Sequence, residues 1–408
     1  MNKTIGNMVI RIIAIYAIFF ITSSVHAQLI RYNRCYIPNG NAQSTVHNVF
    51  VSDTNYVFYG LSNHINPLNV MSFMTDSNGN LIDSKYFGNT LKYNFCGLEE
   101  SVAYTNNSTY LVGLQKDYNS SLVVRNFIMY RFSGTDTMYT ATPYTYTMSC
   151  ELYDNILHED YVYSTGLKAY TINDALHYDV IVMKIDTMGN MIWMNKYGGN
   201  RMDIGYKIMN TSDSKLLVAS KSSSIVGNAG QWWVLKLDTA GNQVWQRNYG
   251  NPLYDDGRPV GLIETSDSCY LITGSYTIEM YGSAEMMKGR ILKIDRFGNV
   301  VWDKLYGDKT IFTNAAIIKE AGNKDLVGVF NNGLNSGYQT PYNPVVYRLT
   351  TKGELKWFRK YYYNDDIYAD ASVLNSFDFT PDGGYIFAGY GIDNDSVPAQ
   401  RSWVIKTD

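Results

Sequence analysis

The fold is decided by a short stretch near the middle of the chain, residues 182–193, which read VMKIDTMGNMIW. The pattern recurs as VLKLDTAGNQVW in residues 234–245 and as ILKIDRFGNVVW in residues 291–302, and each Trp is followed four residues later by Tyr-Gly. In each copy an apolar strand leads into a turn that contains Asp and Gly, and a second strand follows. Asp side chains cap the backbone N–H groups of such turns, and Gly adopts the positive φ that closes them. The stretch therefore predicts a β-hairpin, and its recurrence predicts a repeat architecture.

Three kinds of residue recur in these hairpins, and we expect a structural role for each. The Asp residues are expected to cap the turn, the Gly residues to close it, and the Trp residues to pack between neighbouring repeats. A stacking platform for sugars is the functional alternative for the Trp residues. The recurring positions are Asp186, Gly189 and Trp193, then Asp238, Gly241 and Trp245, then Asp295, Gly298 and Trp302, with Gly353 and Trp357 in a weaker copy.

A second hairpin precedes each of these, so every repeat is expected to contain four short strands. Residues 261–274 and 377–389 are examples, in which two strand-like runs flank a turn of small and polar residues. The second strand, ending in Gly or a small residue, occurs seven times, and so does the third, whereas the fourth occurs six times inside the chain. Residues 29–36 read as the missing fourth strand, displaced to the N-terminus. The sequence therefore predicts an all-β, seven-bladed β-propeller with four antiparallel strands per blade, whose ring is closed by an N-terminal strand that joins the C-terminal blade.

The composition fits a large all-β protein and excludes other classes. Apolar residues make up 45% of the 408 residues and charged residues 17%, with 36 Tyr and 33 Gly. This apolar content can bury a large core, which excludes intrinsic disorder. The formal net charge is −3, so the basic footprint of a nucleic-acid-binding protein is absent and we expect no nucleic-acid partner.

The first 27 residues have the layout of a secretory signal peptide. Lys3 and Arg11 precede an apolar run at residues 12–21, and Ala27 is the small residue before the expected cleavage site. The run is shorter than the roughly 20 residues that a membrane-spanning helix requires. We therefore expect export, a single propeller domain over residues 28–408, no integral membrane segment after cleavage, and a monomer. Periplasm, cell surface and medium are all open as destinations.

The repeat Asp-x-x-Gly-Asn-x-x-Trp, followed by Tyr-Gly and by Asp-Gly-Gly-Tyr-Ile as in residues 382–386, resembles the repeats of a known group of proteins. These are the secreted bacterial β-propellers of the PQQ-like, outer-membrane-assembly-factor-like superfamily, and the resemblance covers nearly all of residues 29–408. It implies a propeller fold, export and often a scaffold role. The turn from Asp186 to Gly189 is one residue shorter than the quinoprotein docking motif, and no vicinal cysteine pair occurs, so we expect no quinone cofactor.

Signatures of catalysis and metal binding are absent from the sequence, which contains no HExxH, GxSxG, P-loop or Rossmann fingerprint. We expect no cofactor, with Ca²⁺ as the one candidate, because residues 393–395 (Asp-Asn-Asp) resemble the start of a calcium loop. The cysteines form no CxxC motif, and an exported chain can oxidise them. Among Cys35, Cys96, Cys150 and Cys269 we favour a Cys96–Cys150 pair, with four unpaired thiols as an equal alternative.

The best candidate for a ligand site lies in the connections between the second and third strands and between successive repeats. These connections are long and differ from one another, whereas the hairpin turns are short and alike. In a four-stranded blade they emerge on one face, and variable loops on a rigid scaffold commonly carry function. The predicted site residues are Arg201, Asp203, Tyr254, Asp255, Asp256, Arg258, Tyr363, Asp365 and Asp366; solvated loop tips are the alternative for the paired carboxylates.

These observations favour a non-enzymatic binding or scaffold protein whose loops hold a protein or glycan partner. The alternative is a carbohydrate-active enzyme with carboxylates arranged around the propeller axis, two of them about 5–10 Å apart. A quinone- or metal-dependent oxidoreductase is a third and weaker possibility.

Overall fold

The computed structural model describes most of the chain after the predicted signal peptide, which itself lies outside the described residues. The described ranges are 29–36, 43–63, 69–88, 92–96, 102–104, 108–117, 125–133, 136–146, 150–172, 175–225, 229–251, 253–281, 284–307, 311–334, 343–363, 372–393 and 399–408. Every regular element within these ranges is a β-strand. In the same ranges, no helix has the length and apolar character needed to cross a membrane.

The strands form seven antiparallel sheets that follow one another along the chain, numbered here sheet 1 to sheet 7. Sheet 1 contains β2 (Ser44–Ser52), β3 (Asn55–Ser62), β4 (Asn69–Asp76) and β5 (Leu81–Phe87). Sheet 2 contains β6 (Lys92–Cys96), β7 (Val102–Tyr104), β8 (Thr109–Asp117), β9 (Arg125–Ser133) and β10 (Asp136–Tyr146). Sheet 3 contains β11 (Cys150–His158), β12 (Tyr161–Ile172), β13 (Ala175–Asp186) and β14 (Met191–Tyr197), and sheet 4 contains β15 (Asp203–Asn210), β16 (Leu216–Ser222), β17 (Gln231–Leu237) and β18 (Gln243–Tyr249).

The last three sheets repeat the same order. Sheet 5 contains β19 (Pro259–Glu264), β20 (Tyr270–Tyr281), β21 (Ala284–Ile294) and β22 (Val300–Tyr306). Sheet 6 contains β23 (Ile311–Glu320), β24 (Leu326–Leu334), β25 (Asn343–Leu349) and β26 (Leu355–Lys360). Sheet 7 contains β27 (Ser372–Phe379), β28 (Tyr385–Asp393), β29 (Ala399–Thr407) and, from the other end of the chain, β1 (Ile30–Tyr36).

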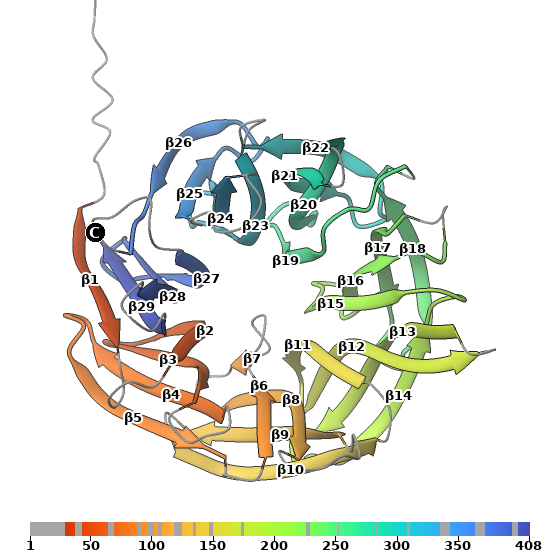
Figure 1. The fold of residues 1–408 in the computed structure, drawn as a ribbon, viewed down its shortest axis with the longest axis horizontal. Helices are drawn as coiled ribbons and strands as arrows, with labels where there is room; N and C mark the ends of the chain where they lie inside the picture. Colours follow the sequence, from red (N-terminus) through yellow and green to blue (C-terminus); the bar gives the residue numbers. More distant parts are fainter. Residues whose placement is uncertain are drawn as a thin grey trace, which may run out of the picture.

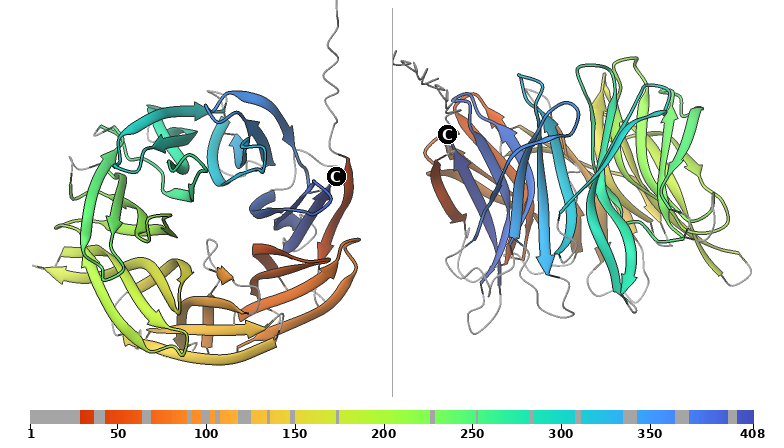
Figure 2. Two further views of the ribbon diagram at one scale, coloured as in Figure 1. Left: turned by 180° about the vertical axis from the view of Figure 1, so that it is seen from behind. Right: turned by 90° about the horizontal axis from the view of Figure 1, so that it is seen from above.

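The seven sheets are arranged in a circle, with the first strand of each nearest the centre and the last at the rim (Figure 1). Seen edge-on, the strands run between the two faces of a disc (Figure 2). The predicted count of seven sheets is confirmed. Sheet 2 differs from the expected four strands because its innermost strand is split: β6 and β7 both pair with β8.

Strand β1 occupies the outer position of sheet 7, which is the position that the sequence predicts for residues 29–36. It pairs antiparallel with β29, from Ile30 opposite Thr407 to Tyr36 opposite Ser402. Sheet 7 in turn contacts sheet 1: the Asn375 side chain donates to the Val46 carbonyl over 2.8 Å, and the Ser376 hydroxyl accepts from the Val49 amide. The two ends of the chain are thus held together by both backbone pairing and side-chain contacts.

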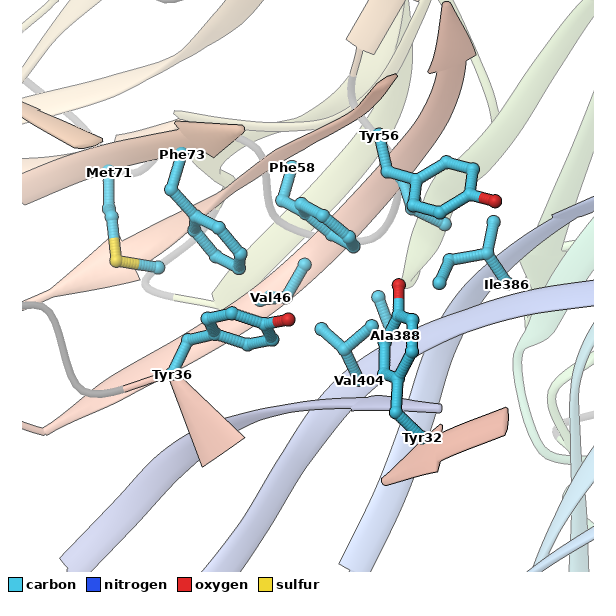
Figure 3. Close-up of a cluster of buried hydrophobic side chains, with 11 residues drawn as sticks. Tyr32, Tyr36, Val46, Tyr56, Phe58, Met71, Phe73, Ile386, Ala388 and Val404 are labelled. Atoms are coloured by element: carbon cyan, nitrogen blue, oxygen red, sulfur yellow. The ribbon is translucent and has the colours of Figure 1, made fainter. Parts of the chain in front are cut away.

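A buried cluster fills the space between sheets 7 and 1 (Figure 3). Tyr36 of β1 stacks on Phe73 of sheet 1 with ring centroids 5.1 Å apart, and Phe73 stacks on Phe58 at 4.5 Å. Val404 and Ile386 of sheet 7 lie on the other side of the same cluster. Comparable clusters lie between the other neighbouring sheets, so the apolar core is distributed around the circle.

The turn between the third and fourth strands has one geometry in most sheets. In sheet 3, Asp186 Oδ1 accepts from the amides of Met188 and Asn190, and Oδ2 accepts from the Asn190 side chain, all within 3.0 Å. Gly189 closes the turn with φ +86°. The same bonds recur at Asp76, Asp238 and Asp295.

These hydrogen bonds favour the ionised carboxylate. Bonds from Asn80 lower the pKa of Asp76, and bonds from Asn242 lower the pKa of Asp238 despite partial burial. In sheet 6 the Thr350 hydroxyl takes the place of the carboxylate and accepts from the amides of Lys352 and Glu354. A turn of this kind therefore requires a side-chain acceptor at its first residue, and Asp is not the sole solution.

Four of these turns also accept a hydrogen bond from the preceding sheet. The Tyr of a fourth strand donates its hydroxyl to the turn Gly carbonyl of the next sheet: Tyr197 to Gly241, Tyr249 to Gly298, Tyr306 to Gly353 and Tyr36 to Gly79, over 2.6–2.8 Å. The Trp indole lies beside it, and Trp245 donates to the Arg296 carbonyl while packing against the core of sheet 5. The recurring Trp residues thus lie at the contacts between sheets.

The lysine or arginine of the third strand is held by the first turn of its own sheet. Lys236 pairs with Asp213, Lys293 with Asp267, Lys406 with Asp382 and Arg348 with Asp325, with N···O distances of 2.7–2.9 Å. The three lysines are buried, whereas the partners of two of them, Asp213 and Asp267, are half exposed. These ion pairs join the two hairpins of a sheet at the same face.

Candidate functional site

The antiparallel order of the strands gives the disc two different faces. The turns between first and second strands and between third and fourth strands emerge on one face, which we call the turn face. The connections between second and third strands and between successive sheets emerge on the other, which we call the loop face. All of the site residues predicted from the sequence belong to loop-face connections, and Asp365 and Asp366 lie outside the described residues.

The connection from sheet 4 to sheet 5 places four of the predicted residues together, in residues 253–258, which we call the 253–258 loop. Tyr254 is half-buried and its amide donates to the Asn251 carbonyl. Asp255 is half exposed and reaches back to sheet 4, where it accepts from the Gly230 amide over 2.7 Å and from Lys221 Nζ over 2.9 Å. Asp255 therefore fixes the loop against β16 and the start of β17.

The next residue, Asp256, points inward and is fully buried. Its amide donates to the Gly230 carbonyl over 2.8 Å, and its Oδ1 lies 3.4 Å from the Thr277 amide. Within the part of the chain that the structure describes, Oδ2 has no hydrogen-bond partner, and Arg290 Nη1 lies 3.9 Å away. Burial raises the pKa of Asp256 to about 7, and Arg290 reduces the effect only in part.

Arg258, at the end of the loop, is exposed and lies beside aromatic residues of the innermost strands. Its guanidinium carbon lies 5.9 Å from the ring centroid of Tyr206 in β15. The ring of Tyr206 lies 5.2 Å from that of Tyr153 in β11, tilted by 41°. The Tyr153 hydroxyl donates to Glu151 Oε2 over 2.5 Å. Glu151, Tyr153, Tyr206 and Arg258 thus form a continuous row across sheets 3, 4 and 5, which we call the inner row.

A β-bulge at equivalent positions of the innermost strands sets the direction in which Tyr153 and Tyr206 point. In β2, β11, β15, β19, β23 and β27 the pairing with the second strand shifts by one residue at equivalent places. The residue left out of register is His47, Tyr153, Tyr206, Val260, Ala316 or Asn375. A bulge redirects the side chain of the extra residue, which explains why Tyr153 and Tyr206 meet although they lie on different sheets. Burial also lowers the pKa of His47 to about 4, so its imidazole is neutral at pH 7.

The inner row is absent from the residues that the sequence predicted, apart from Arg258. One sequence signal could have revealed it: the Gly near the end of the second strand. A Cβ at Gly60, Gly166 or Gly389 would lie 1.8–1.9 Å from the carbonyl oxygen of the first strand, just before the bulge. These glycines therefore mark the bulge position, and the residue that follows it in the first strand is the one that varies between repeats.

The connection between sheets 3 and 4 contains the other predicted pair, and its two members differ in exposure. Asp203 is fully buried and accepts from the hydroxyls of Ser222 and Ser224 and from the Gly199 amide. Arg201 is exposed at the tip that Asp203 holds in place, and its amide donates to Ser224 Oγ. The geometry makes Asp203 a support for the loop and leaves Arg201 available to a partner.

The remaining described candidate, Tyr363, packs on sheet 7. Its ring lies 5.9 Å from Trp403 in an edge-on arrangement, and its hydroxyl lies 3.3 Å from Cys35 Sγ. It lies apart from the 253–258 loop in the chain and in the order of sheets. The structure therefore brings together Tyr254, Asp255, Asp256 and Arg258, and does not join Tyr363 to them.

The predicted Ca²⁺ site and the predicted disulfide can be compared with the structure only where their side chains are described. No group of three or more His, Cys, Asp or Glu that could hold a metal ion is found among the described residues. Asn394 and Asp395 of the proposed calcium loop lie outside them, as does the side chain of Cys96. The Ca²⁺ site and the Cys96–Cys150 pair stay predictions.

Comparison with known proteins finds solved structures of similar fold and no relative in sequence. No family model matches the chain, and no curated protein matches its sequence. Among solved structures, an ulvan lyase of a polysaccharide lyase family bound to -[GlcA(1-4)Rha3S]- has a TM-score of 0.51 at 8% identity, with 76% of this chain and 80% of that chain covered. The polysaccharide lyase Uly1 has a TM-score of 0.49 at 10% identity, with 92% and 91% covered. The β-propeller domain of the Trilobed protease from Pyrococcus furiosus has a TM-score of 0.48 at 9% identity, with 88% and 95% covered.

Seven antiparallel sheets arranged in a circle make the chain a β-propeller. At these identities the similarity concerns the fold alone, so the activities of the lyases and of the protease say nothing about this propeller. Its seven sheets are the blades, and the inner row lies on the innermost strands β11 and β15 of two consecutive blades and on the loop residue that precedes β19 of the next.

Proposed function

We propose that this chain is an exported, non-enzymatic binding propeller that holds a glycan or protein partner on its loop face. In this proposal residues 1–27 are a cleaved signal peptide, and residues 28–408 form one monomeric domain whose ring is closed by β1. The mature protein acts in the periplasm, at the cell surface or in the medium. Its repeat resembles those of the secreted PQQ-like, outer-membrane-assembly-factor-like propellers, and we propose that it holds no quinone.

The observation that carries the proposal is the inner row. Tyr153 and Tyr206 present two neighbouring rings that are half-buried and held by their surroundings, so little conformational entropy is lost when a partner packs on them. Arg258 lies at one end of the pair as a fork of hydrogen-bond donors, and Glu151 lies at the other end as an acceptor. A sugar presents apolar C–H groups to an aromatic ring and hydroxyls to such donors and acceptors, so a glycan matches this arrangement best.

In this proposal the rest of the 253–258 loop and the exposed Arg201 belong to the same binding surface. Asp255 and Lys221 add a charged pair at its edge, and Tyr254 adds a third half-buried ring. Tyr and Arg are the residues most enriched at the energetic centres of interfaces, so the same surface also suits a protein partner.

A glycan array probed with the mature protein tests the proposal, followed by calorimetric titration of the best hit. We expect Tyr206→Ala and Arg258→Ala each to weaken binding at least tenfold, which corresponds to about 1.4 kcal/mol. Phe358→Ala is the matched control, because Phe358 is an exposed aromatic residue on the outermost strand β26. Equal affinity of the Tyr206 variant and the wild type would place the site elsewhere.

A carbohydrate-active enzyme is the second candidate, and one contact favours it. The Tyr153 hydroxyl donates to the Glu151 carboxylate, and a phenol paired with a carboxylate can exchange a proton with a reacting sugar. Release of shortened saccharides from a glycan that the array identifies, lost in Glu151→Gln, would establish this candidate in place of pure binding.

A further inference from the structure

The carboxyl group of Asp256 is surrounded by polar and charged residues from several elements, yet these residues would neutralise the negative charge of its ionised form only weakly. Oδ2 packs against the backbone of Gly250, where an added Cβ would lie 2.4 Å away. The charged and titratable groups that face Asp256 are Arg290 of sheet 5, Tyr276 of β20, Lys221 of β16 and Asp255 of the loop itself, and behind Arg290 lie Asp303 of sheet 5 and Tyr249 of β18. Of these, only Arg290 is a cation in the buried space.

Arg290 is committed to other groups. Its Nε and Nη2 donate to the two oxygens of Asp303 over 3.0 and 2.7 Å, and its Nη1 donates to the Tyr249 carbonyl. The guanidinium lies between the rings of Trp232 and Tyr276, with its carbon 4.7 and 5.0 Å from their centroids. The arginine therefore neutralises Asp303 first, and an ionised Asp256 would be a buried charge with weak compensation.

The same carboxyl group lies at the root of the 253–258 loop. The residues on either side of it are tied to sheets 4 and 5: Thr277 Oγ1 donates to the Asp255 carbonyl over 2.6 Å, and Trp232 Nε1 donates to the Gly257 carbonyl over 2.7 Å. Arg258 follows two residues later. An opening of the loop that carries the Asp256 carboxyl toward water would break these bonds and shift Arg258 relative to Tyr206.

We propose that Asp256 is a proton-controlled latch for the 253–258 loop and thereby the positioning residue for Arg258. When the carboxyl is protonated it remains inside, the loop is closed, and Arg258 lies over Tyr206. When it is ionised, hydration of the carboxylate favours the open loop, and the inner row loses its cation. The latch stands on the geometry of sheets 4 and 5; its effect on ligand binding rests on the proposed function.

The pKa of about 7 for Asp256 places this change within the physiological range. The sign follows from linkage. The pKa is raised above the value near 3.9 of an unfolded chain, so the native, closed state binds the proton more strongly. Its stabilisation is complete below about pH 4 and is lost as the pH rises through 7.

Amide hydrogen exchange at pH 6 and pH 8 on the whole mature protein tests the latch. The reporting amides are Asp256, which donates to Gly230, and Gly230, which donates to Asp255. After correction for the intrinsic pH dependence of exchange, we expect their protection to fall about tenfold from pH 6 to pH 8. The Gly298 amide, which donates to Asp295 in a turn-face turn, is the internal control and should not change.

Two variants sharpen the test. Asp256→Asn cannot ionise, so the pH dependence of protection should disappear, whereas Asp160→Asn, at an exposed carboxylate of the turn face, should retain it. Should Asp256→Asn fail to fold, the carbon-13 shift of the Asp256 carboxyl in the wild type decides the question: a midpoint between about 6 and 8 supports the latch, and a midpoint below 5 overturns it.

Binding of the best array glycan at the two pH values separates this inference from the proposed function. Weaker binding at pH 8 that becomes pH-independent in Asp256→Asn supports both. If amide protection depends on pH but no glycan binds, the latch is supported and the proposed glycan partner is contradicted. If the glycan binds with equal affinity at both pH values and amide protection does not change with pH, the latch is contradicted and the proposed binding function is supported.

Discussion

The two faces of this propeller are built on opposite plans. On the turn face, the same Asp-capped turn, the same Tyr-to-Gly hydrogen bond and the same Lys–Asp ion pair recur from blade to blade. On the loop face the connections that the structure describes differ from one another, and the carboxylates Asp203 and Asp256 are buried in unlike surroundings. Repetition marks the interactions that hold the blades together, and departures from it mark the place where a partner can be recognised.

Removal of a recurring Trp should produce the largest effect on stability. Trp245→Ala deletes an indole that packs against the core of sheet 5 and donates to the Arg296 carbonyl. We expect a loss of about 3 kcal/mol in the free energy of unfolding, because the space between two blades cannot collapse fully. Chemical denaturation measures it. Phe358→Ala, at an exposed position of β26, should change stability by less than about 0.5 kcal/mol. Equal effects of the two would show that blade contacts do not depend on the Trp.

A pair of glycine variants separates backbone strain from contact between blades. Gly298 and Gly383 have nearly the same φ, +84° and +86°. A Cβ at Gly298 would lie 2.8 Å from Arg247 and 3.2 Å from the Tyr249 hydroxyl, whereas a Cβ at Gly383 would meet nothing within 4 Å. Gly383→Ala should cost about 1 kcal/mol from strain alone, and Gly298→Ala about 2 kcal/mol or more. Thermal unfolding of both variants measures the loss in the free energy of unfolding. Equal losses would contradict the claim that the Gly298 turn packs against the preceding blade.

The two faces should respond to pH in opposite directions. Burial tends to raise the pKa of Asp382, but hydrogen bonds from Thr380 and Lys406 outweigh it and lower the pKa to about 2. This value lies below that of an unfolded chain, so the stabilisation is present above about pH 4 and is lost as the pH falls toward 2. At Asp256, stabilisation is lost as the pH rises.

Melting temperatures of the wild type and Asp382→Asn between pH 6 and pH 2 test this difference. The variant should be less stable at pH 6, and the gap should close toward pH 2. Asp160→Asn, an exposed carboxylate in the equivalent turn of sheet 3, is the control and should follow the wild type. A constant gap across the whole range would mean that the Lys406–Asp382 pair does not titrate as described.

The smallest of the expected effects concerns the junction between the two ends of the chain. Tyr36 and Tyr249 make the same 2.6 Å hydrogen bond to a turn Gly, one from β1 to sheet 1 and the other between sheets 4 and 5. Tyr36→Phe and Tyr249→Phe should each cost about 1 kcal/mol. Similar values in denaturant titrations would mean that the junction behaves as any other blade contact, and a negligible cost for Tyr36→Phe alone would mean that the junction is loose.

The sequence predicted the repeated parts of the molecule because repetition is visible in residues. The Asp-Gly turns, the number of sheets and the position of β1 all follow from counting equivalent stretches. The ion pairs were missed, because Lys236 of the third strand and Asp213 of the turn between the first and second strands come together only in the folded sheet. The split of β6 and β7 also left no periodic signal.

The candidate site was predicted in part. The loops were identified by their variability, but the sequence Asp255-Asp256 does not reveal that the first carboxylate is half exposed and the second fully buried. Tyr153 and Tyr206 were not singled out, because a one-residue bulge reverses which face of a strand a side chain occupies. The glycines opposite the bulge were noticed as strand ends, and their contact with the first-strand backbone became visible only in three dimensions.

The central claim, that recognition belongs to the loop face and not to the turn face, is tested most directly by one array experiment with two variants. Tyr206→Ala alters the inner row, and Phe297→Ala alters an equally large aromatic residue that is 63% exposed on the turn face. We predict that the wild type and Phe297→Ala bind the same glycans with the same intensity and that Tyr206→Ala loses them. Binding that survives Tyr206→Ala but disappears in Phe297→Ala would contradict the account and move the functional surface to the face that we assign to structure.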